Sequence, residues 1–500
     1  MKLKFRNLIL TSFAALAIGC STDPREITEE NPEGSTLRAV RPNNFSRNRF
    51  YRQPVSFDVT KNLVDDFGVN NTDTNDDSAK LNRAINSFAD GEVGRIIIPE
   101  GNYYLLNIRM KSNVHLEIAK GATIFPVKGL AEDRNHRIFN FGARGQKKIE
   151  STSVYGKGGR FTVDLRNNSS NNLIVADIGE ADGFRLANLN ILDDKTIFAS
   201  VLISFFDKKG VAEAWPHNGI VENITQTNAH TGYGLIQGYA ADNVLFKNLK
   251  CTGGVTLRLE TDNLAMKKAG KGGLRDIFAN KIIGKDGLTP VMFSPHFMEN
   301  GKITIDDVTA IGCAYAVRVE HGFIEIFDTE NRSKGAFRNY IEGLLGAGSI
   351  SNIYRRNNGT VWAVRIADEF NDIAFEHSEL GGIKPGKFET SEVTNVKVVY
   401  KNSGAKIKEA FLQYLPCGEW DKVCRPGESG FEYSGPSLGI TIDKTKRDGS
   451  LGNYDVNVTV AEGKNTFPSG YILHVTDSTP KGCSSGVGTI ASCDVVIDKK

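Results

Sequence analysis

The sequence predicts an all-β protein, a right-handed parallel β-helix with an N-terminal capping helix and smaller C-terminal additions. Two observations indicate this fold class. Glycine and asparagine account for 51 and 41 of the 500 residues, and both are unfavourable in helix interiors but suited to tight turns. Between these turns, short runs of alternating apolar residues recur, which is typical of strands. A β-sandwich assembled from the same strands is the alternative.

Charge and apolar content exclude several classes of protein. The chain has 61 Lys and Arg residues against 59 Asp and Glu residues, and 40% of its residues are apolar. A chain-wide basic field, as in nucleic-acid-binding proteins, is therefore absent, and wholesale disorder is not indicated. We expect no nucleic-acid partner. This balance does not exclude a few arginines concentrated in one groove.

Residues 1–19 are typical of a signal peptide. A basic start precedes an apolar stretch, Leu8–Ile18, that is too short to span a bilayer. The small residue before Cys20 resembles a bacterial lipoprotein signal, which implies lipidation of the Cys20 thiol and an exported, outer-membrane lipoprotein. Ordinary cleavage that yields a secreted extracellular protein is the alternative. Residues 20–51 are polar and unpatterned, so we expect a lipid-anchored or flexible tether and no other membrane contact.

A helix is predicted over residues 77–88, before a short isoleucine-rich strand. Its apolar residues recur at i, i+3, i+4 and i+7, so one face packs on the rest of the protein; they are Leu81, Ala84, Ile85 and Phe88. This arrangement resembles the N-terminal cap of pectate-lyase-like parallel β-helices. The helix would shield the open end of a solenoid core.

Residues 52–321 are assigned to the parallel β-helix and its catalytic groove. Similar apolar runs are centred on Asn188, Asn223, Asn248 and Asp307, at steps of 35, 25 and 59 residues. These steps are consistent with one or more solenoid coils plus insertions. Asn and Asp tolerate a left-handed backbone at such corners, and stacked asparagine side chains can form a ladder.

The pattern loosens after the predicted solenoid. Residues 322–390 are read as an insertion or groove-covering subdomain, with a partly helical stretch at 333–345. Residues 391–500 return to strands and are read as a C-terminal β region. We expect the protein to be a monomer.

Six cysteines remain after the lipidation candidate, in a compartment that allows disulfides. Cys417 with Cys424, and Cys483 with Cys493, are close enough in sequence to pair. The remaining two, Cys251 and Cys313, are buried thiols or a third bridge. There is no CxxC pair and no cluster of Cys and His, which argues against a zinc site.

Two carboxylates stand out on the predicted strand at residues 256–262. Alternation places Arg258, Glu260 and Asp262 on one face and leucines on the other. Carboxylates at i and i+2 have Cα atoms roughly 6.5–7 Å apart, which is closer to the spacing of about 6.5–9.5 Å in inverting glycosidases than to about 5–5.5 Å in retaining ones. An ordinary solvated face is the alternative.

Neighbouring coils add polar residues at this level. Gln237 precedes Glu260 by 23 residues, His296 follows Glu260 by 36, and Glu320 follows His296 by 24. Each step is about one coil, so these residues are expected to lie in a line across stacked strands. Arg258 and Arg318 would lie beside this line. Guanidinium groups bind sulfate and carboxylate through paired hydrogen bonds, so the face suits an acidic polysaccharide.

The chain resembles the iota-carrageenases, β-helical glycoside hydrolases that cleave β-1,4 linkages of a sulfated red-algal galactan, iota-carrageenan, with inversion. The resemblance covers residues 59–320 and is carried by the cap and by four motifs: Gly238-Tyr239, Arg258-Leu-Glu-Thr-Asp262, Ser294-Pro-His296 and Ala316-Val-Arg-Val-Glu320. It also implies that residues 322–385 correspond to an insertion that closes over the groove.

The resemblance implies roles for individual residues. Glu260 would be the general acid and Asp262 the general base. Gln237 and His296 would position water and sugar. Four further residues would bind substrate, namely Arg258, Arg318, Tyr239 and Glu320.

No redox or organic cofactor is required for this chemistry, but the resemblance leaves room for structural calcium or another ion. Asp73 to Asp77 looks like the start of a calcium loop, yet position twelve is Ala84 rather than Glu. A GxSxG match at residues 482–486 lacks a downstream His.

Two other classes of function remain open. A β-helical polysaccharide lyase would use Lys267 or Lys268 as its base, but the paired carboxylates would then have no role. A non-catalytic surface glycan-binding protein is the third possibility. A galacturonan hydrolase is disfavoured because its additional Asp pair and Gly-His-Gly motif are missing from the sequence.

Overall fold

The structure is a computed structural model that describes residues 46–142, 145–166, 168–206, 214–356, 360–400, 405–407, 412, 415–426, 430–435, 437–443, 456–461, 474–476, 490 and 492–493. They belong to one compact unit, Phe45–Lys500. The predicted signal peptide and Cys20 lie outside the described residues. In the part of the chain that is described, no helix is long and apolar enough to cross a membrane.

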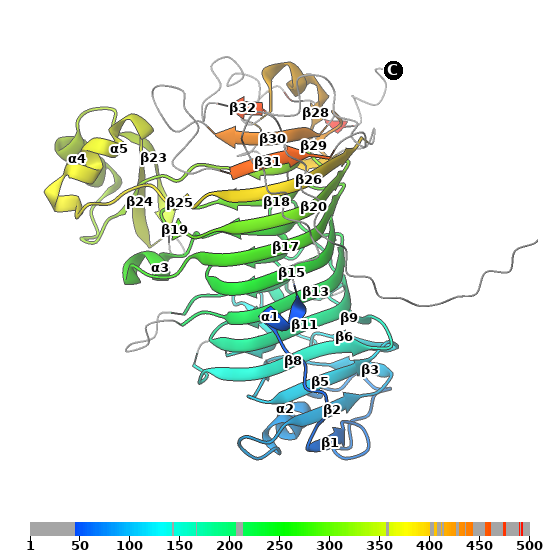
Figure 1. The fold of residues 1–500 in the computed structure, drawn as a ribbon. Helices are drawn as coiled ribbons and strands as arrows, with labels where there is room; N and C mark the ends of the chain where they lie inside the picture. The colour runs from blue at the N-terminus through cyan, green and yellow to red at the C-terminus, as the bar shows by residue number, and fades with distance from the viewer. Residues whose placement is uncertain are drawn as a thin grey trace, which may run out of the picture. The chain divides into compact units, whose positions relative to one another are not determined.

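Two long parallel sheets form a solenoid of stacked coils (Figure 1). The larger sheet contains, in order of pairing, β1 (Val59–Asn62), β2 (Gly94–Ile98), β5 (Val114–Ala119), β8 (Ile149–Lys157), β11 (Ala181–Leu192), β13 (His217–Thr227), β15 (Ala241–Thr252), β17 (Leu274–Lys285), β20 (Ile303–Ile311), β26 (Ser391–Val399) and β31 (Val456–Val460); β3 (Gly101–Tyr104), β6 (Ala122–Phe125) and β9 (Phe161–Asp164) branch from it. The second sheet contains β4 (Ile108–Arg109), β7 (His136–Phe141), β10 (Leu173–Ile178), β12 (Val201–Ile203), β14 (Gly234–Gly238), β16 (Val255–Glu260), β18 (Thr289–Ser294), β21 (Tyr315–Val319), β30 (Leu438–Asp443) and β32 (His474–Thr476).

This topology confirms the predicted parallel β-helix. Strands inside each sheet pair in parallel with the strands on both sides, as β15 does with β13 and β17. A sandwich of antiparallel strands is therefore excluded. Alternate side chains point between the sheets and form one continuous apolar core along the coils. The predicted cap is α2 (Ser78–Asn86), whose Leu81, Ala84 and Ile85 are buried in this core.

The corner prediction is also confirmed. Asn188, Asn223, Asn248 and Asp307 all have φ between 52° and 59°. Asn223 donates from Nδ2 to Oδ1 of Asn188 over 3.0 Å, and its own Oδ1 accepts from Asn248 over 2.8 Å. Lys281, with φ of 60°, occupies the corner between Asn248 and Asp307. The sequence pattern missed this coil because lysine is not a typical left-handed corner residue.

The packed fold begins slightly before the predicted boundary at residue 52. Helix α1 (Arg47–Phe50) contacts the outer face of the larger sheet. Phe50 and Tyr51 are buried there against Ile220 and Leu245. The last residues of the predicted tether are therefore part of the folded unit.

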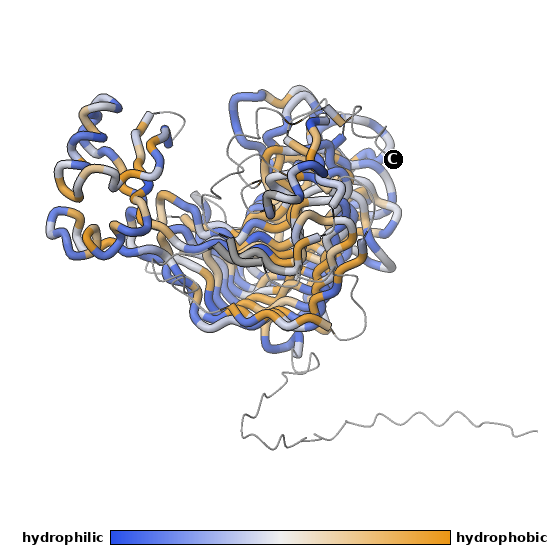
Figure 2. The backbone as a smooth tube through the Cα atoms, turned by 90° about the horizontal axis from the view of Figure 1, so that it is seen from above, coloured by the Kyte–Doolittle hydropathy of each residue, from blue (hydrophilic) through white to orange (hydrophobic). Residues whose placement is uncertain are grey.

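The predicted insertion is a separate lobe beside the coils (Figures 1 and 2). Its antiparallel sheet contains β22 (Glu325–Phe327), β24 (Val361–Ile366) and β23 (Ile350–Arg356). The helices are α4 (Lys334–Leu345), η2 (Asp368–Phe370), α5 (Asn371–Glu376) and η3 (Ser378–Leu380). Phe337, Ile341 and Val364 are among the residues of a small core that belongs to this lobe alone. The insertion therefore has its own packing.

A narrow neck joins the insertion to the solenoid. The backbone N–H groups of Phe323 and Gly386 both donate to the carbonyl oxygen of His296, over 2.8 and 2.9 Å. A Cβ atom on Gly322 would lie 1.9 Å from the carbonyl oxygen of Gly386, so only glycine fits where the two segments touch. Next to the neck, β19 (Glu299–Asn300) pairs with β25 (Lys387–Phe388).

The C-terminal part corrects the predicted division at residue 391. β26 and β31 extend the larger sheet and β30 and β32 extend the second one, so the solenoid continues through this part. A small antiparallel sheet packs beside them, made of β27 (Ala405–Ile407), β29 (Phe431–Tyr433) and β28 (Val423–Cys424); η5 (Cys417–Lys422) comes directly before β28 in the chain.

The predicted disulfides are wrong. Cys424 is bonded to Cys493, across 69 residues of sequence. A parallel bridge between Arg425 and Ser492 brings these distant segments together, which nearness in sequence does not reveal. Cys424 is thus not paired with Cys417, nor Cys493 with Cys483, which lies outside the described residues. Cys251 and Cys313 are free buried thiols, so the thiol alternative is correct for both.

Candidate active site

The candidate residues lie at the end of β16, in the second sheet. Leu257 and Leu259 point into the core, and Arg258 and Glu260 point to the other face. After the strand ends, Thr261 fixes the next turn, because its Oγ1 donates to the carbonyl oxygen of Pro295 over 2.9 Å. Asp262 follows this turn. The strand alternation predicted from sequence therefore holds for Arg258 and Glu260, whereas Asp262 lies beyond the end of the strand.

The predicted line of polar residues is two rows rather than one. Strand pairing aligns Gln237 with Arg258, and Arg258 with Met292 and then Arg318. Glu260 is aligned with Ser294 in the next row. Gln237 still reaches the site, since its Nε2 donates to the backbone oxygen of Glu260 over 2.7 Å. It is nearly fully buried, so its amide holds the strand end in this structure.

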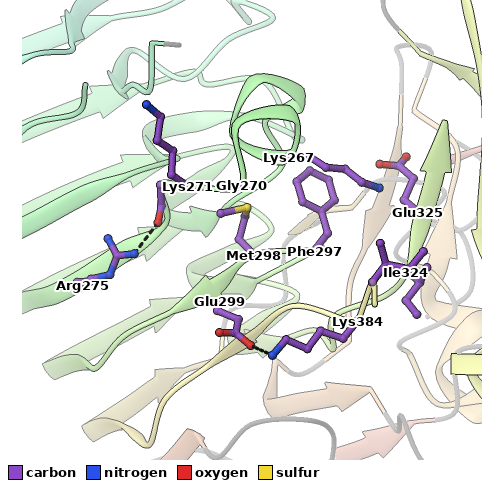
Figure 3. A pocket seen from close by; sticks show the side chains of 12 residues that line it. Lys267, Gly270, Lys271, Arg275, Phe297, Met298, Glu299, Ile324, Glu325 and Lys384 are labelled. Atoms are coloured by element: carbon purple, nitrogen blue, oxygen red, sulfur yellow. Dashed lines mark hydrogen bonds and ion pairs between the residues drawn. The ribbon is translucent and has the colours of Figure 1, made fainter. Parts of the chain in front are cut away.

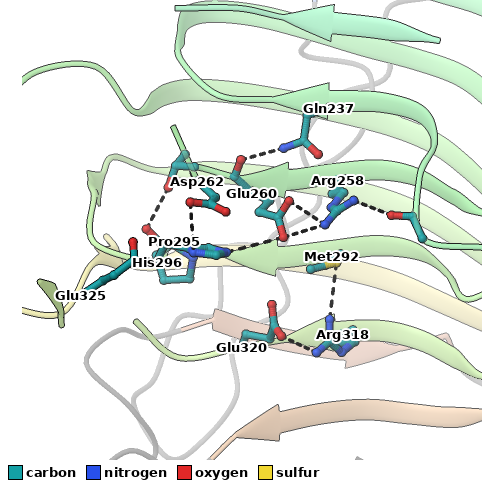
Figure 4. A network of polar contacts seen from close by, with 12 residues as sticks. Gln237, Arg258, Glu260, Asp262, Met292, Pro295, His296, Arg318, Glu320 and Glu325 are labelled. Carbon is teal, nitrogen blue, oxygen red and sulfur yellow. Dashed lines mark hydrogen bonds and ion pairs between the residues drawn. The ribbon is translucent and has the colours of Figure 1, made fainter. Parts of the chain in front are cut away.

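The imidazole of His296 lies between the two carboxylates (Figure 4). Its Nε2 is 3.5 Å from Oε1 of Glu260, and its Nδ1 is 3.6 Å from Oδ1 of Asp262. The residue has a left-handed backbone with φ of 47°, which turns the chain just after β18. The ring of Phe323 covers the imidazole at a centroid distance of 4.7 Å. Glu260, Asp262 and His296, which the sequence predicted to act together, thus form one partly buried cluster.

Charges around the cluster fix the location of its proton. Burial raises the pKa of Glu260, but the Arg258 guanidinium and His296 outweigh this and hold the pKa well below its usual range. Arg258 contacts both carboxylate oxygens of Glu260, at 2.6 and 2.7 Å. Burial lowers the pKa of His296, but Asp262 and Glu260 raise it more, to a net value above 6.5. These directions favour an ionised Glu260 and a protonated imidazole on His296.

Arg318 and Glu320 form a second pair, one coil further along. The Arg318 side chain is 0% exposed and contacts Glu320 and the sulfur of Met292. This burial disagrees with the expectation that Arg318 binds sulfate. Burial raises the pKa of Glu320, but Arg318 and a hydrogen bond from Ser294 together outweigh it, so the net pKa is lowered. Arg318 is therefore buried behind its pair, whereas the Glu320 side chain is 16% exposed, about as much as that of Glu260 at 13%.

The insertion adds a residue that the sequence pattern did not predict. Arg356, at the end of β23, donates from Nη1 and Nη2 to the two oxygens of Asp262, each over 2.9 Å. Its Nε also donates to Glu325 over 2.9 Å. Arg356 is 94 residues from Asp262 in sequence and belongs to no repeat, so no pattern in the chain could have paired them.

With this geometry in view, comparison with known proteins identifies the family. No family model matches the chain. The iota-carrageenase of Zobellia galactanivorans is 61% identical over 504 aligned residues, which cover 99% of this chain and 100% of the relative. The chain belongs to the iota-carrageenase family. The iota-carrageenase of Alteromonas macleodii is 38% identical, over 91% of each chain.

Solved iota-carrageenase structures share the fold. The family GH82 iota-carrageenase of A. fortis superposes with a TM-score of 0.77 at 36% identity, covering 88% of this chain and 93% of the other. An iota-carrageenase complexed to iota-carrageenan fragments gives a TM-score of 0.77 at 37% identity, covering 88% and 95%. The chain is accordingly a glycoside hydrolase. The lyase and the non-catalytic glycan-binding protein are not supported.

Two further predictions concern Tyr239 and bound ions. Tyr239 lies near Glu260, and its pKa is raised, first by burial and then by that carboxylate. Among the described residues, one group could offer three metal ligands, Cys424, Glu432 and Cys493, but the two sulfurs are joined in the disulfide. Asp73 uses its carboxylate for hydrogen bonds to Asn70 and Asn75. Within the described residues, groups of His, Cys, Asp and Glu thus give the structural-ion prediction no candidate site.

Proposed function

We propose that the protein is an endo-acting hydrolase that cleaves the β-1,4 linkages of iota-carrageenan with inversion. Glu260 acts as the general acid and Asp262 as the general base. The observation that carries this proposal is the imidazole between the two carboxylates, at 3.5 and 3.6 Å. The ring keeps the two carboxylates apart, and inverting glycosidases likewise keep their carboxyl groups about 6.5–9.5 Å apart so that a water can reach the sugar.

In the reaction, Glu260 gives a proton to the glycosidic oxygen as the bond from that oxygen to the anomeric carbon breaks. Water attacks the anomeric carbon from the opposite face, and Asp262 takes the proton that the water loses. Arg258 holds the ionised form of Glu260, so Glu260 receives its proton from the His296 imidazolium as the leaving group departs.

His296 also provides a route to reset the site. After each turnover the extra proton is on Asp262, whereas the acid side of the cluster lacks one. His296 gives its Nε2 proton to Glu260 and keeps the proton on Nδ1, so the proton left on Asp262 leaves to solvent, and solvent returns one to Nε2 to restore the imidazolium. This assigns His296 to proton transfer, beyond the positioning of water and sugar that the sequence implied.

We also propose that the protein acts outside the cytoplasm as an exported monomer, anchored through a lipidated Cys20. The support is the sequence of residues 1–20 alone. Mass spectrometry of the protein recovered from membranes tests it, because a diacylglycerol adduct on an N-terminal Cys20 is expected.

A substrate panel tests the proposed activity. Reducing ends are measured with kappa-, iota- and lambda-carrageenan, agarose and pectate, for the wild type and for Glu260→Gln. Activity is expected on iota-carrageenan, with a loss of about 10²- to 10⁴-fold in the variant, the usual contribution of general acid catalysis. Glu342→Gln is the matched control, since Glu342 pairs with Arg338 on α4, away from the cluster.

Two results would contradict the proposal. Unchanged activity of Glu260→Gln would remove Glu260 from the acid role. Proton NMR of the first product gives the stereochemistry, and retention of the anomeric configuration would exclude the water-mediated mechanism through Asp262.

A further inference from the structure

The base carboxylate is covered from the side of the insertion. Arg356 makes a bidentate pair with Asp262, so each carboxylate oxygen already accepts one charged hydrogen bond of 2.9 Å. His296 approaches Oδ1 from the solenoid side. The Asp262 side chain is only 21% exposed. A carboxylate held in this way is a weaker acceptor for a water proton than one whose oxygens are open, because its lone pairs and charge are engaged.

Arg356 is placed to be drawn away from Asp262 without leaving the site. The opposite side of its guanidinium contacts Glu325, whose Oε1 also accepts from the hydroxyl of Tyr354. Arg356 is 28% exposed, so its guanidinium can be reached from solvent. It also stands at the last residue of β23, in a lobe with its own core. Exchange of partners therefore requires rotation of one side chain rather than unfolding.

A cavity of about 380 Å³ lies between the solenoid and the insertion (Figure 3), and it reaches Glu325, the second partner of Arg356. Glu325 lines it, together with four basic residues and one further acid, namely Lys267, Lys271, Arg275, Lys384 and Glu299. The ammonium of Lys267 lies over the rings of Phe297 and Phe327, at 4.9 and 4.5 Å from their centroids. The excess of basic side chains favours an anionic group in this cavity.

A sulfate ester offers a guanidinium the same geometry as a carboxylate. Its oxygens accept two parallel hydrogen bonds from the planar fork, so sulfate and Asp262 compete for the same donors of Arg356. Lysine could not make this exchange as well, because an ammonium is a point charge without a fork. The residue type at position 356 therefore matters as much as its charge.

From these contacts we propose that Arg356 makes hydrolysis depend on sulfate, because a sulfate ester of the bound galactan takes Arg356 from Asp262 and thereby uncovers the base. The inference rests on the proposed function and adds a specificity-determining residue to it. Arg356 touches the base before substrate binds and touches the substrate afterwards. A chain without sulfate binds to a site whose base stays covered, so it is cut slowly even when it occupies the groove.

The test compares iota-carrageenan oligosaccharides with the same oligosaccharides after chemical desulfation, using the full chain. Arg356→Gln is the main variant. Arg355→Gln is the matched control, because Arg355 is next along β23 but stacks on Trp362 at 3.8 Å and donates to the oxygen of Thr360. The measured quantity is kcat and KM on each substrate, expressed as the preference for sulfated over desulfated chains.

In Arg356→Gln the preference is expected to fall by about tenfold or more, the effect of one lost pair of charged hydrogen bonds. The kcat on desulfated chains should rise, since the base is open, and the KM on sulfated chains should increase. Arg355→Gln should keep the wild-type preference. An equal loss on both substrates, or no change, would overturn the proposal, because Arg356 would then be structural or uninvolved.

Binding separates this proposal from the hydrolase assignment. Calorimetry on Glu260→Gln, with and without Arg356→Gln, measures affinity without turnover. The double variant should bind the sulfated oligosaccharide about tenfold more weakly and the desulfated one equally well. Equal affinity for the sulfated chain would refute the role of Arg356 even if hydrolysis stands. If the wild type cuts neither substrate, the proposed function fails, and this measurement still decides whether Arg356 binds sulfate.

A folding defect is detected by circular dichroism and by the melting temperature. Should Arg356→Gln misfold, Arg356→Lys serves in both measurements, since it keeps the charge without the fork. The preference of Arg356→Lys for sulfated over desulfated chains should be lower than that of the wild type, but by less than the tenfold expected when the charge is removed as well. A wild-type preference in Arg356→Lys would contradict the bidentate exchange.

Discussion

The solenoid and the insertion are held together in different ways. In the solenoid, strands inside each sheet pair with counterparts in two other coils, and one apolar core runs through them. The insertion has a local antiparallel sheet, short helices and a small core of its own. The solenoid supplies Glu260, Asp262 and His296, and the insertion supplies Arg356. The fixed groups of the site thus come from the part with extensive pairing, and the exchangeable group comes from the lobe.

Truncating one phenylalanine in each core tests whether the insertion and the solenoid unfold independently. Phe337→Ala in the insertion and Phe246→Ala in the solenoid remove equally buried rings, each at a cost of about 3–5 kcal/mol. Phe337→Ala is expected to open the insertion alone, seen as fast hydrogen exchange over residues 322–390 with the main thermal transition unchanged. Phe246→Ala should lower the main transition. If both variants lower the same transition, the two regions form one cooperative unit.

Substitutions at two corner residues test how much the asparagine ladder stabilises the solenoid. Asn223→Ala removes two ladder hydrogen bonds and leaves a left-handed backbone without asparagine, so a loss of about 2–4 kcal/mol is expected. Lys281→Asn places a suitable residue in the same column and should stabilise the protein by about 0.5–1 kcal/mol. Chemical denaturation measures both. Opposite signs are expected, and a loss in both variants would show that the ladder does not govern these corners.

The pH profile of activity tests His296, a solenoid residue whose carbonyl oxygen accepts hydrogen bonds from the neck of the insertion. The pKa of His296 is raised above 6.5, so the imidazole keeps its proton up to a higher pH than a free histidine. Activity that depends on this proton is present below that pKa and lost as the pH rises through it. The alkaline limb of kcat/KM is therefore expected above pH 6.5, and NMR of labelled imidazole, assigned with His296→Asn, should titrate with it.

Lys267 is the competing explanation for such a limb, because burial lowers its pKa to about 8. Lys267→Met distinguishes the two, since the limb should persist in that variant. A limb that disappears with Lys267, or one that falls below pH 6.5, would remove His296 from the proton-transfer role.

The parts of the molecule that repeat were the parts that the sequence predicted. Alternating leucines beside Glu260 fixed the face of its strand, and Asn188, Asn223 and Asn248 marked the corners, because each coil solves the same packing problem. Lys281 broke the corner pattern and was missed. Register across coils was also misjudged, since loop lengths differ between them, and Gln237 faces Arg258 rather than Glu260.

Contacts that occur once were not predictable in this way. Cys424 meets Cys493 through a bridge that nearness in sequence does not show. Arg356 reaches Asp262 because an entire lobe folds beside the groove. Burial also could not be read from the sequence, as for Arg318, which we expected to bind sulfate and which is fully buried and paired with Glu320.

Because Gly322 and Gly386 lie side by side at the neck, the insertion could be removed from the chain as a whole. Its two ends already touch, so a short turn could replace the whole lobe without parting any pair of coils. Such a graft would have to keep the N–H groups of Phe323 and Gly386, because both donate to the carbonyl oxygen of His296 and hold its left-handed turn. The insertion can thus be replaced or redesigned as a unit, provided that the N–H groups of Phe323 and Gly386 stay in place.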